Sequence, residues 1–245
     1  MIYVKTPQEI EKIKASCLII GDMLKLLEEK IRPGVATKDL DRFAFDYIAS
    51  RGAKPNFLGY GGFPGTICVS IDEQVVHGFP SDRVLKEGEI VSIDTGCVLN
   101  GYHSDAARTF PVGNCSPEKL RLIEVTKECF FKGIEAITIG GAIGDIGYAV
   151  QQHAESNGFS VVRDMVGHGV GRFLHEEPEV PNYGKKGVGV RIRRGMTLAV
   201  EPMINMGDYH VDIDGWKCVT SDGKPSAHYE NTIAITDNGV EILTL

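Results

Sequence analysis

Several features that define whole classes of protein are missing from this chain of 245 residues. Its six cysteines form no CxxC pair, and their scattered spacing suits neither a zinc finger nor a disulfide scaffold. The N-terminus has no apolar segment behind a basic start, as a signal peptide would have. No stretch approaches the roughly 18 unbroken apolar residues of a membrane span. We therefore expect a cytoplasmic protein with reduced cysteines and no membrane association.

Positive charge is also in deficit, with 26 Lys and Arg against 33 Asp and Glu and a net charge of -7. This balance argues against direct nucleic-acid specificity. One basic segment stands out, formed by Lys185, Lys186, Arg191, Arg193 and Arg194. We favour a solvated basic loop there, with a transient ribosome contact as the alternative. Nothing in the sequence demands more than a monomer.

The order of the expected elements suggests an internal repeat. Helical patterns predict four helices. The first begins at a capping box starting with Thr6 and is ended by Pro33-Gly34, and the second covers about 38–51. The third begins at Ser116, and the fourth covers about 144–158. Short β-like runs lie at 67–71, 90–94, 108–112, 196–200 and 231–236. A shift of 107 residues aligns Asp94 with Glu201. We expect one α/β (α+β) catalytic domain, 1–245, with pseudo-twofold halves of about 1–113 and 114–245.

The first half ends an apolar run on Asp94 and carries Asp105 beyond Asn100-Gly101, a strong hairpin signal. A hairpin there brings the two carboxylates close together. Alone, Asp94 could be an ordinary turn residue before Gly96. As a pair the carboxylates repel and would hold a proton between them, unless a cation is shared.

The second half repeats this arrangement. Glu201 ends an apolar run at Pro202, which cannot donate to a strand ladder, and Glu230 opens another apolar strand. Each alone could be an ordinary strand-end glutamate. His168 lies in Gly167-His168-Gly169, where the glycines let the backbone approach a ligand or a second strand closely.

Together these side chains form an oxygen-rich set with a single imidazole, which favours Mn²⁺, Fe²⁺ or Co²⁺ over a structural zinc, although Zn²⁺ can also bind. Four carboxylates carry too much charge for one divalent ion, whereas two ions about 3.5–4 Å apart would balance them. A thermolysin-like zinc site is excluded, because His175 is not part of an H-E-x-x-H helix and Pro178 follows closely. The sequence therefore predicts a dinuclear metallohydrolase with the ligands Asp94, Asp105, His168, Glu201 and Glu230.

At these residues the chain closely resembles the methionine aminopeptidase family. The motifs that carry the resemblance, in the family's order and spread over nearly the whole chain, are Val76-His77-Gly78, Ser92-Ile93-Asp94-Thr95-Gly96, Gly101-Tyr102-His103-Ser104-Asp105, Gly167-His168-Gly169-Val170-Gly171-Arg172, His175-Glu176-Glu177-Pro178, Glu201-Pro202-Met203 and Tyr229-Glu230-Asn231-Thr232. The resemblance implies the pita-bread fold and the short, bacterial type I form. It also implies removal of the N-terminal methionine from nascent polypeptides, with a preference for a small second residue.

The resemblance further implies individual roles. Asp94 would chelate one metal, His168 and Glu201 the other, and Asp105 and Glu230 would bridge both. A water shared by the metals would become hydroxide near neutral pH and attack the first peptide carbonyl. Glu201 would shuttle the proton to the leaving amine. Two histidines complete the catalytic set: His175 would stabilise charge on the scissile carbonyl, and His77 would contact the peptide nitrogen or the intermediate.

A methionine side chain needs an apolar, adaptable pocket. At the family's pocket positions stand Tyr60, Phe63, Cys68 and Trp216, with Phe57 and Leu174 beside them. Phe57 replaces a frequent Cys, Phe63 a Tyr and Leu174 a Phe, so the shape of the pocket should differ from the better-known pattern. Simple core packing is the alternative for each aromatic. Asp72 stands where the family has an Asn near a monovalent-cation site, so the resemblance leaves a monovalent cation as an open alternative there.

Two alternatives remain open. A proline-specific aminopeptidase of the same fold shares the metal set but usually carries an extra N-terminal domain, which 245 residues cannot hold. A non-catalytic pita-bread binding protein would have kept the fold and lost the chemistry. All five ligands and both histidines are present, which favours the enzyme.

Overall fold

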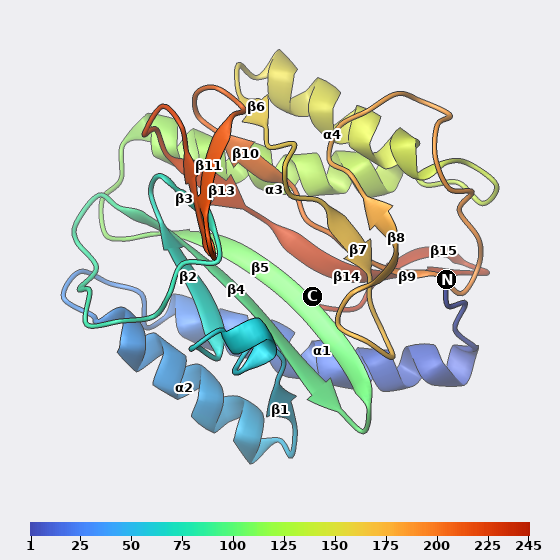
Figure 1. Ribbon diagram of the computed structural model, residues 1–245, viewed down its shortest axis with the longest axis horizontal. Coiled ribbons are helices and arrows are strands. Elements are labelled where there is room, and N and C mark those ends of the chain that lie inside the picture. The colour runs from blue at the N-terminus through green and yellow to red at the C-terminus, as the bar shows by residue number, and fades with distance from the viewer.

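The computed structural model describes all 245 residues and contains four long helices. They are α1 (Pro7–Glu28), α2 (Thr37–Ser50), α3 (Pro117–Glu135) and α4 (Ile143–Ser156). Figure 1 shows α1 and α2 on one side of the molecule and α3 and α4 on the other, with the strands between them. None of these helices is both long enough and apolar enough to cross a bilayer.

The helix starts follow from local sequence. The Thr6 side chain accepts a hydrogen bond from the Glu9 amide while the Glu9 carboxylate accepts one from the Thr6 amide, which is the predicted capping box. The predicted end of this helix at Pro33-Gly34 was wrong, because α1 stops at Glu28. Proline disfavours helical geometry in the residue before it and clashes with the preceding turn. The last turn before Pro33 is therefore lost.

The central sheet has nine strands in the order β1-β4-β5-β14-β9-β7-β8, with β2 pairing β4 and β15 pairing β14. Their bounds are β1 (Lys54–Pro55), β2 (Ile67–Ile71), β4 (Ile90–Leu99), β5 (Tyr102–Pro111), β7 (Gly167–Gly169), β8 (Glu176–Val180), β9 (Thr197–Val200), β14 (Glu230–Thr236) and β15 (Gly239–Ile242). Every pairing in this sheet is antiparallel. β14 is the strand that joins the β4–β5 hairpin to β9 and β7, so it holds the two parts of the sheet together.

Two three-stranded sheets accompany the central one. The first has the order β13 (Ser226–His228), β10 (Met203–Asn205) and β6 (Ser160–Val161), and the second the order β11 (Val211–Asp214), β12 (Lys217–Thr220) and β3 (Gln74–Val76). These short strands were not predicted, because two to four residues give too little alternation to separate a strand from a loop. The second sheet joins β3 of the first half to a hairpin of the second.

The interior divides into two large apolar clusters. One buries Phe130, Ile146 and Leu198 among twenty residues, nearly all from the second half of the chain. The other buries Met23, Leu40 and Val91 among nineteen residues between positions 20 and 112. Each helix pair thus covers its own part of the sheet, as the predicted α/β arrangement of two helices and antiparallel strands per half requires.

Candidate metal centre

The β4–β5 hairpin places Asp94 and Asp105 on one face of the sheet. Its turn, Asn100-Gly101, has positive φ at both residues (52° and 80°), which matches the right-handed twist of the strands. The register sets Asp105 opposite Gly96 and Asp94 opposite Ala107, so the two carboxyl groups are diagonal neighbours. A Cβ on Gly96 would lie 2.5 Å from the Ser104 carbonyl oxygen, so only glycine allows the strands to approach this closely.

The second acidic pair flanks β14. Glu230 is its first residue and lies opposite Ala107 of β5, while Asn231 lies opposite Val200, the last residue of β9. Glu201 directly follows that strand end, as Pro202 predicted, and its carbonyl oxygen accepts a hydrogen bond from Asn182 at 2.9 Å. Because β14 pairs with both β5 and β9, the acidic pairs of the two halves meet across three adjacent strands.

His168 is held on β7 by two close backbone contacts. A Cβ on Gly167 would lie 2.4 Å from the Ala199 carbonyl oxygen, and one on Gly169 would lie 2.5 Å from the Glu177 carbonyl oxygen. The glycines therefore serve to admit neighbouring strands, as expected. His168 Nδ1 lies 2.9 Å from the Gly169 carbonyl oxygen, which can only accept, so Nδ1 carries the hydrogen. The lone pair of Nε2 then faces Asp105 at 3.7 Å and Glu201 at 3.5 Å.

The five side chains fit a cation. Asp105, His168 and Glu230 each offer one ligand atom, and these atoms lie within 4.8 Å of one another. Three buried carboxylate oxygens, Asp94 Oδ1, Asp105 Oδ1 and Glu230 Oε1, have no hydrogen-bond partner in the protein. Buried oxygens of this kind are costly unless something binds them. Hard oxygen donors with one neutral imidazole suit a divalent ion.

The pKa values of these side chains also favour cation binding. Burial, opposed by hydrogen bonds from Asp105 and Thr95, raises the pKa of Asp94 to about 7. Burial and the charges of neighbouring carboxylates raise the pKa values of Asp105, Glu201 and Glu230 well above their usual range. Burial also lowers the pKa of His168 to about 4, which keeps the ring in the neutral form that binds metals. Without a cation the carboxylates repel one another, and a bound cation removes that conflict.

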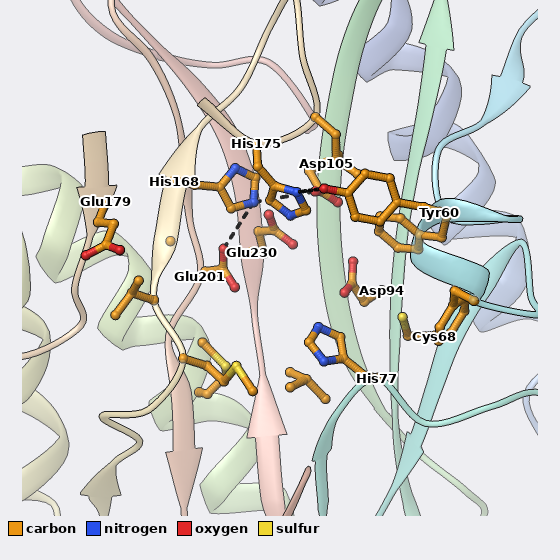
Figure 2. A pocket seen from close by; sticks show the side chains of 18 of the residues that line it. Tyr60, Cys68, His77, Asp94, Asp105, His168, His175, Glu179, Glu201 and Glu230 are labelled. Carbon is orange, nitrogen blue, oxygen red and sulfur yellow. Dashed lines mark hydrogen bonds and ion pairs between the residues drawn. The ribbon is translucent and has the colours of Figure 1, made fainter. Parts of the chain in front are cut away.

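Two further histidines point at this cluster (Figure 2). His175 packs its ring against His168 with centroids 4.4 Å apart, and its Nδ1 lies 2.9 Å from the Tyr60 hydroxyl. His77 follows β3 and has a positive φ of 61°, a conformation that non-glycine residues rarely adopt. Burial lowers the pKa of both rings, so both are neutral near pH 7. The structure thus gathers the seven predicted catalytic and ligand residues around one cavity.

Known proteins with the same features place this geometry in a family. Residues 11–237 match the profile of metallopeptidase family M24. The chain belongs to this family. The methionine aminopeptidase of Clostridium perfringens is 56% identical over 100% of this chain and 99% of the relative. The solved methionine aminopeptidase of Rickettsia prowazekii superposes with a TM-score of 0.98 at 42% identity, and each chain covers 100% of the other.

These comparisons confirm both the sequence resemblance to methionine aminopeptidases and the pita-bread fold. A prolidase from Pyrococcus furiosus, representing the predicted rival, superposes with a TM-score of 0.80 at 24% identity. This chain covers 65% of that protein, while 99% of this chain is matched. At that identity the likeness concerns the fold alone. The chain is therefore an M24 metallopeptidase of the aminopeptidase type.

Beside the ligands, this M24 metallopeptidase has an apolar compartment within a cavity of about 480 Å³. Phe57, Phe63, Cys68 and Leu174 form one buried cluster, with Trp216 packed against it. Tyr60 lines the same cavity and remains half exposed at its mouth. All six predicted pocket residues are thus together, and Phe57 faces the cavity as well as the core.

Several lining residues were not predicted from the sequence. Val76, Met165 and Met203 add apolar wall, and Glu179 lies on β8 at one side of the cavity. His228 is buried, both of its ring nitrogens lack hydrogen-bond partners, and its Nε2 lies 3.9 Å from Glu201. Burial lowers its pKa to about 3. His228 ends β13, whereas Glu230 begins β14 of another sheet, and His228 is not itself part of the cavity lining.

Asp72 and the basic segment lie outside this cluster. The Asp72 carboxylate accepts hydrogen bonds from the Lys119 ammonium at 2.7 Å and from the Ile90 amide at 3.1 Å. The basic residues 185, 186, 191, 193 and 194 are all exposed, and Arg194 pairs with Asp237. Neither feature contacts the five ligands.

Proposed function

We propose that this chain removes the N-terminal methionine from nascent polypeptides with the help of two divalent metal ions. One observation carries the proposal: four carboxylates and a neutral imidazole lie beside an apolar compartment, and both line one cavity of about 480 Å³. The cluster suits hydrolysis at a peptide carbonyl, and the compartment suits one flexible apolar side chain. The family and its methionine aminopeptidase relatives agree with both.

Four carboxylates favour two ions over one, because a single divalent ion would leave two negative charges uncompensated in a buried site. We propose that Asp94 would hold one ion and His168 and Glu201 the second, with Asp105 and Glu230 available to either. Mn²⁺, Fe²⁺, Co²⁺ and Zn²⁺ all suit this donor set, and availability decides among them. When bound, the ions supply a nucleophilic water at neutral pH and Lewis acidity toward the scissile carbonyl.

The protein's own groups then complete the reaction. Glu201 would accept the proton released by the attacking water and deliver it to the leaving amine, since its side chain lines the cavity beside the other ligands. A neutral His175 donates a hydrogen bond to the carbonyl oxygen as negative charge develops there. His77 lies across the cavity from His175 (Figure 2). We propose that it contacts the peptide nitrogen or the intermediate.

The residues that line the cavity determine which substrate side chains fit. The compartment formed by Phe57, Phe63, Cys68, Leu174 and Trp216 takes the methionine side chain. An ion held by Asp94 would offer a binding place for the free α-amino group of the substrate, which would restrict cleavage to N-termini. Val76 and Met203 are buried residues of the cavity wall, and we propose that they limit the second residue to small side chains.

Domain organisation, location and the features outside the metal centre lead to further proposals. We propose a single catalytic domain over 1–245 that works as a monomer in the cytoplasm. The exposed basic segment offers a surface for transient ribosome contact, with a solvated loop as the simpler alternative. The ammonium of Lys119 already supplies a positive charge at Asp72. We therefore propose that turnover does not depend on a monovalent cation, and a loss of activity when K⁺ and Na⁺ are replaced by tetramethylammonium would contradict this.

The decisive experiment offers two peptides to purified protein supplied with Mn²⁺ or Co²⁺. Release of free methionine from Met-Ala-Ser, with Ala-Pro-Ala left intact, supports the proposal. Cleavage of Ala-Pro-Ala alone would favour the proline-specific alternative. Cleavage of neither peptide, in protein shown to hold metal, would favour a non-catalytic binding protein.

A further inference from the structure

The N-terminal segment of the chain contributes a buried ion pair next to the cavity. The Lys5 ammonium contacts the Glu176 carboxylate, and the two side chains are only 1% and 0% exposed. Removing two charges from water is costly unless they are paired and their other hydrogen-bonding atoms are satisfied. A pair buried this completely therefore fixes the positions of both segments that carry it.

Glu176 is the residue directly after His175. Its second carboxylate oxygen accepts hydrogen bonds from the backbone amides of Arg172, at 2.7 Å, and Phe173, at 3.0 Å. The carboxylate at the end of the 172–176 turn thus binds the two amides at its start. The turn carries Leu174, a wall of the apolar compartment, and His175, the ring that faces the ligands.

Lys5 is itself anchored by the backbone. Its amide donates to the Gly195 carbonyl oxygen at 2.7 Å, in the loop that precedes β9. A Cβ on Gly171 would lie 2.6 Å from Lys5 Cε, so the glycine leaves room for the lysine stem. A second pair, Arg172 with Glu9 at 2.6 Å, ties the same turn to the first turn of α1.

We infer that Lys5 is a positioning residue for catalysis: through Glu176 it holds the 171–175 turn in the geometry that aims His175 at the scissile carbonyl. The inference rests on the proposed function for its kinetic consequence, although the geometric claim can be tested without turnover. It makes Lys5 part of the support of the site, although Lys5 does not line the cavity.

The kinetic test uses Lys5→Met, which keeps the stem and removes the charge. A misplacement of about 1 Å in a catalytic group can cost about 100-fold in rate, so we expect kcat for Met-Ala-Ser to fall by about that factor while KM changes less than about threefold. Lys14→Met is the matched control, because Lys14 pairs α1 with Glu241 of β15 at the surface, away from the cavity. That variant should keep wild-type kinetics.

A double variant separates positioning from stability. Lys5→Met leaves Glu176 as a buried, unpaired charge and is expected to lower Tm. Adding Glu176→Gln removes that charge while keeping an acceptor for the two amides, so Tm should recover. If Lys5 positions the turn, kcat stays low in the double variant. Recovery of kcat together with Tm, or a wild-type kcat in Lys5→Met, would overturn the inference.

A third measurement does not depend on turnover. The imidazole NMR signals of the metal-loaded protein, with that of His175 assigned from a His175→Gln variant, should show His175 shifted or broadened in Lys5→Met while the buried His228 is unchanged. An unperturbed His175 signal would also refute the inference. If the wild type releases no methionine, the proposed function fails, and this signal alone then decides the role of Lys5.

Discussion

The hydroxyl oxygen of Tyr60 lies 2.9 Å from Nδ1 of His175, and the two rings pack with centroids 5.4 Å apart. Tyr60 belongs to a short 3-10 turn (Tyr60–Gly62) that follows Gly59, a residue with a positive φ of 83°. Tyr60 was predicted only as a wall of the methionine pocket. Its hydroxyl can also select the tautomer of His175: if it donates to Nδ1, the hydrogen of the neutral ring is on Nε2 and is free for the substrate.

Replacing Tyr60 by Phe should therefore lower kcat with little change in KM. Loss of one hydrogen bond worth about 1 kcal/mol corresponds to a roughly fivefold fall. Steady-state kinetics with Met-Ala-Ser would measure it. Tyr47→Phe is the control, because the Tyr47 hydroxyl only accepts from Arg51 on the surface of α2. A raised KM with an unchanged kcat would mean that Tyr60 is a pocket wall and nothing more.

Metal binding should strengthen as pH rises. Burial raises the pKa of Asp94 to about 7, and those of the other three carboxyls are also raised. In the metal-free folded protein these groups keep their protons to higher pH than usual, and a metal must displace them. The apparent affinity for Mn²⁺ should therefore be higher at pH 8 than at pH 6. Titration calorimetry in buffers of different ionisation heat would also detect the released protons, and equal affinities at the two pH values would contradict the prediction.

Glu201→Gln keeps the shape of the side chain but removes a charge and a proton acceptor. We expect turnover to fall by roughly 10²- to 10⁴-fold, the usual contribution of a general base, and the amount of bound metal to decrease. Metal analysis beside kinetics separates the two effects. Glu135→Gln makes the same change in net charge at a surface pair with Lys132 and should have no effect. Unchanged turnover in Glu201→Gln would remove that residue from the mechanism.

Gly169→Ala tests the backbone packing that holds His168. The new Cβ would lie 2.5 Å from the Glu177 carbonyl oxygen and 3.0 Å from that of Glu176, and neither backbone atom can move without separating β7 from β8. Overpacking of this kind costs about 1–3 kcal/mol, so the unfolding midpoint in urea should fall. Mn²⁺ affinity should fall with it, because His168 moves with the strand. A variant with wild-type stability and affinity would show that β7 has room to adjust.

The parts of the site that could be predicted from the sequence are those determined by residues close together in the chain. The Asn100-Gly101 turn fixes the register that pairs Asp94 with Asp105, and Pro202 fixes the strand end that presents Glu201. The parts that were missed depend on long-range packing. Lys5 and Glu176 are 171 residues apart, and no pattern within either segment indicates that they meet. The shortest strands were not predicted for a related reason: their hydrogen-bond partners lie far away in the chain.

The position of β14 between β5 and β9 affects how the two parts of the chain can separate on unfolding. Asp94 and Asp105 belong to the part of the chain before α3, and His168, Glu201 and Glu230 to the part after α4. Metal held by both sets would act as a non-covalent cross-link between the two parts, and neither part could then open without losing it. A cut in the chain between β5 and α3 would leave two fragments with an incomplete set of ligands each, so metal binding would report their reassembly.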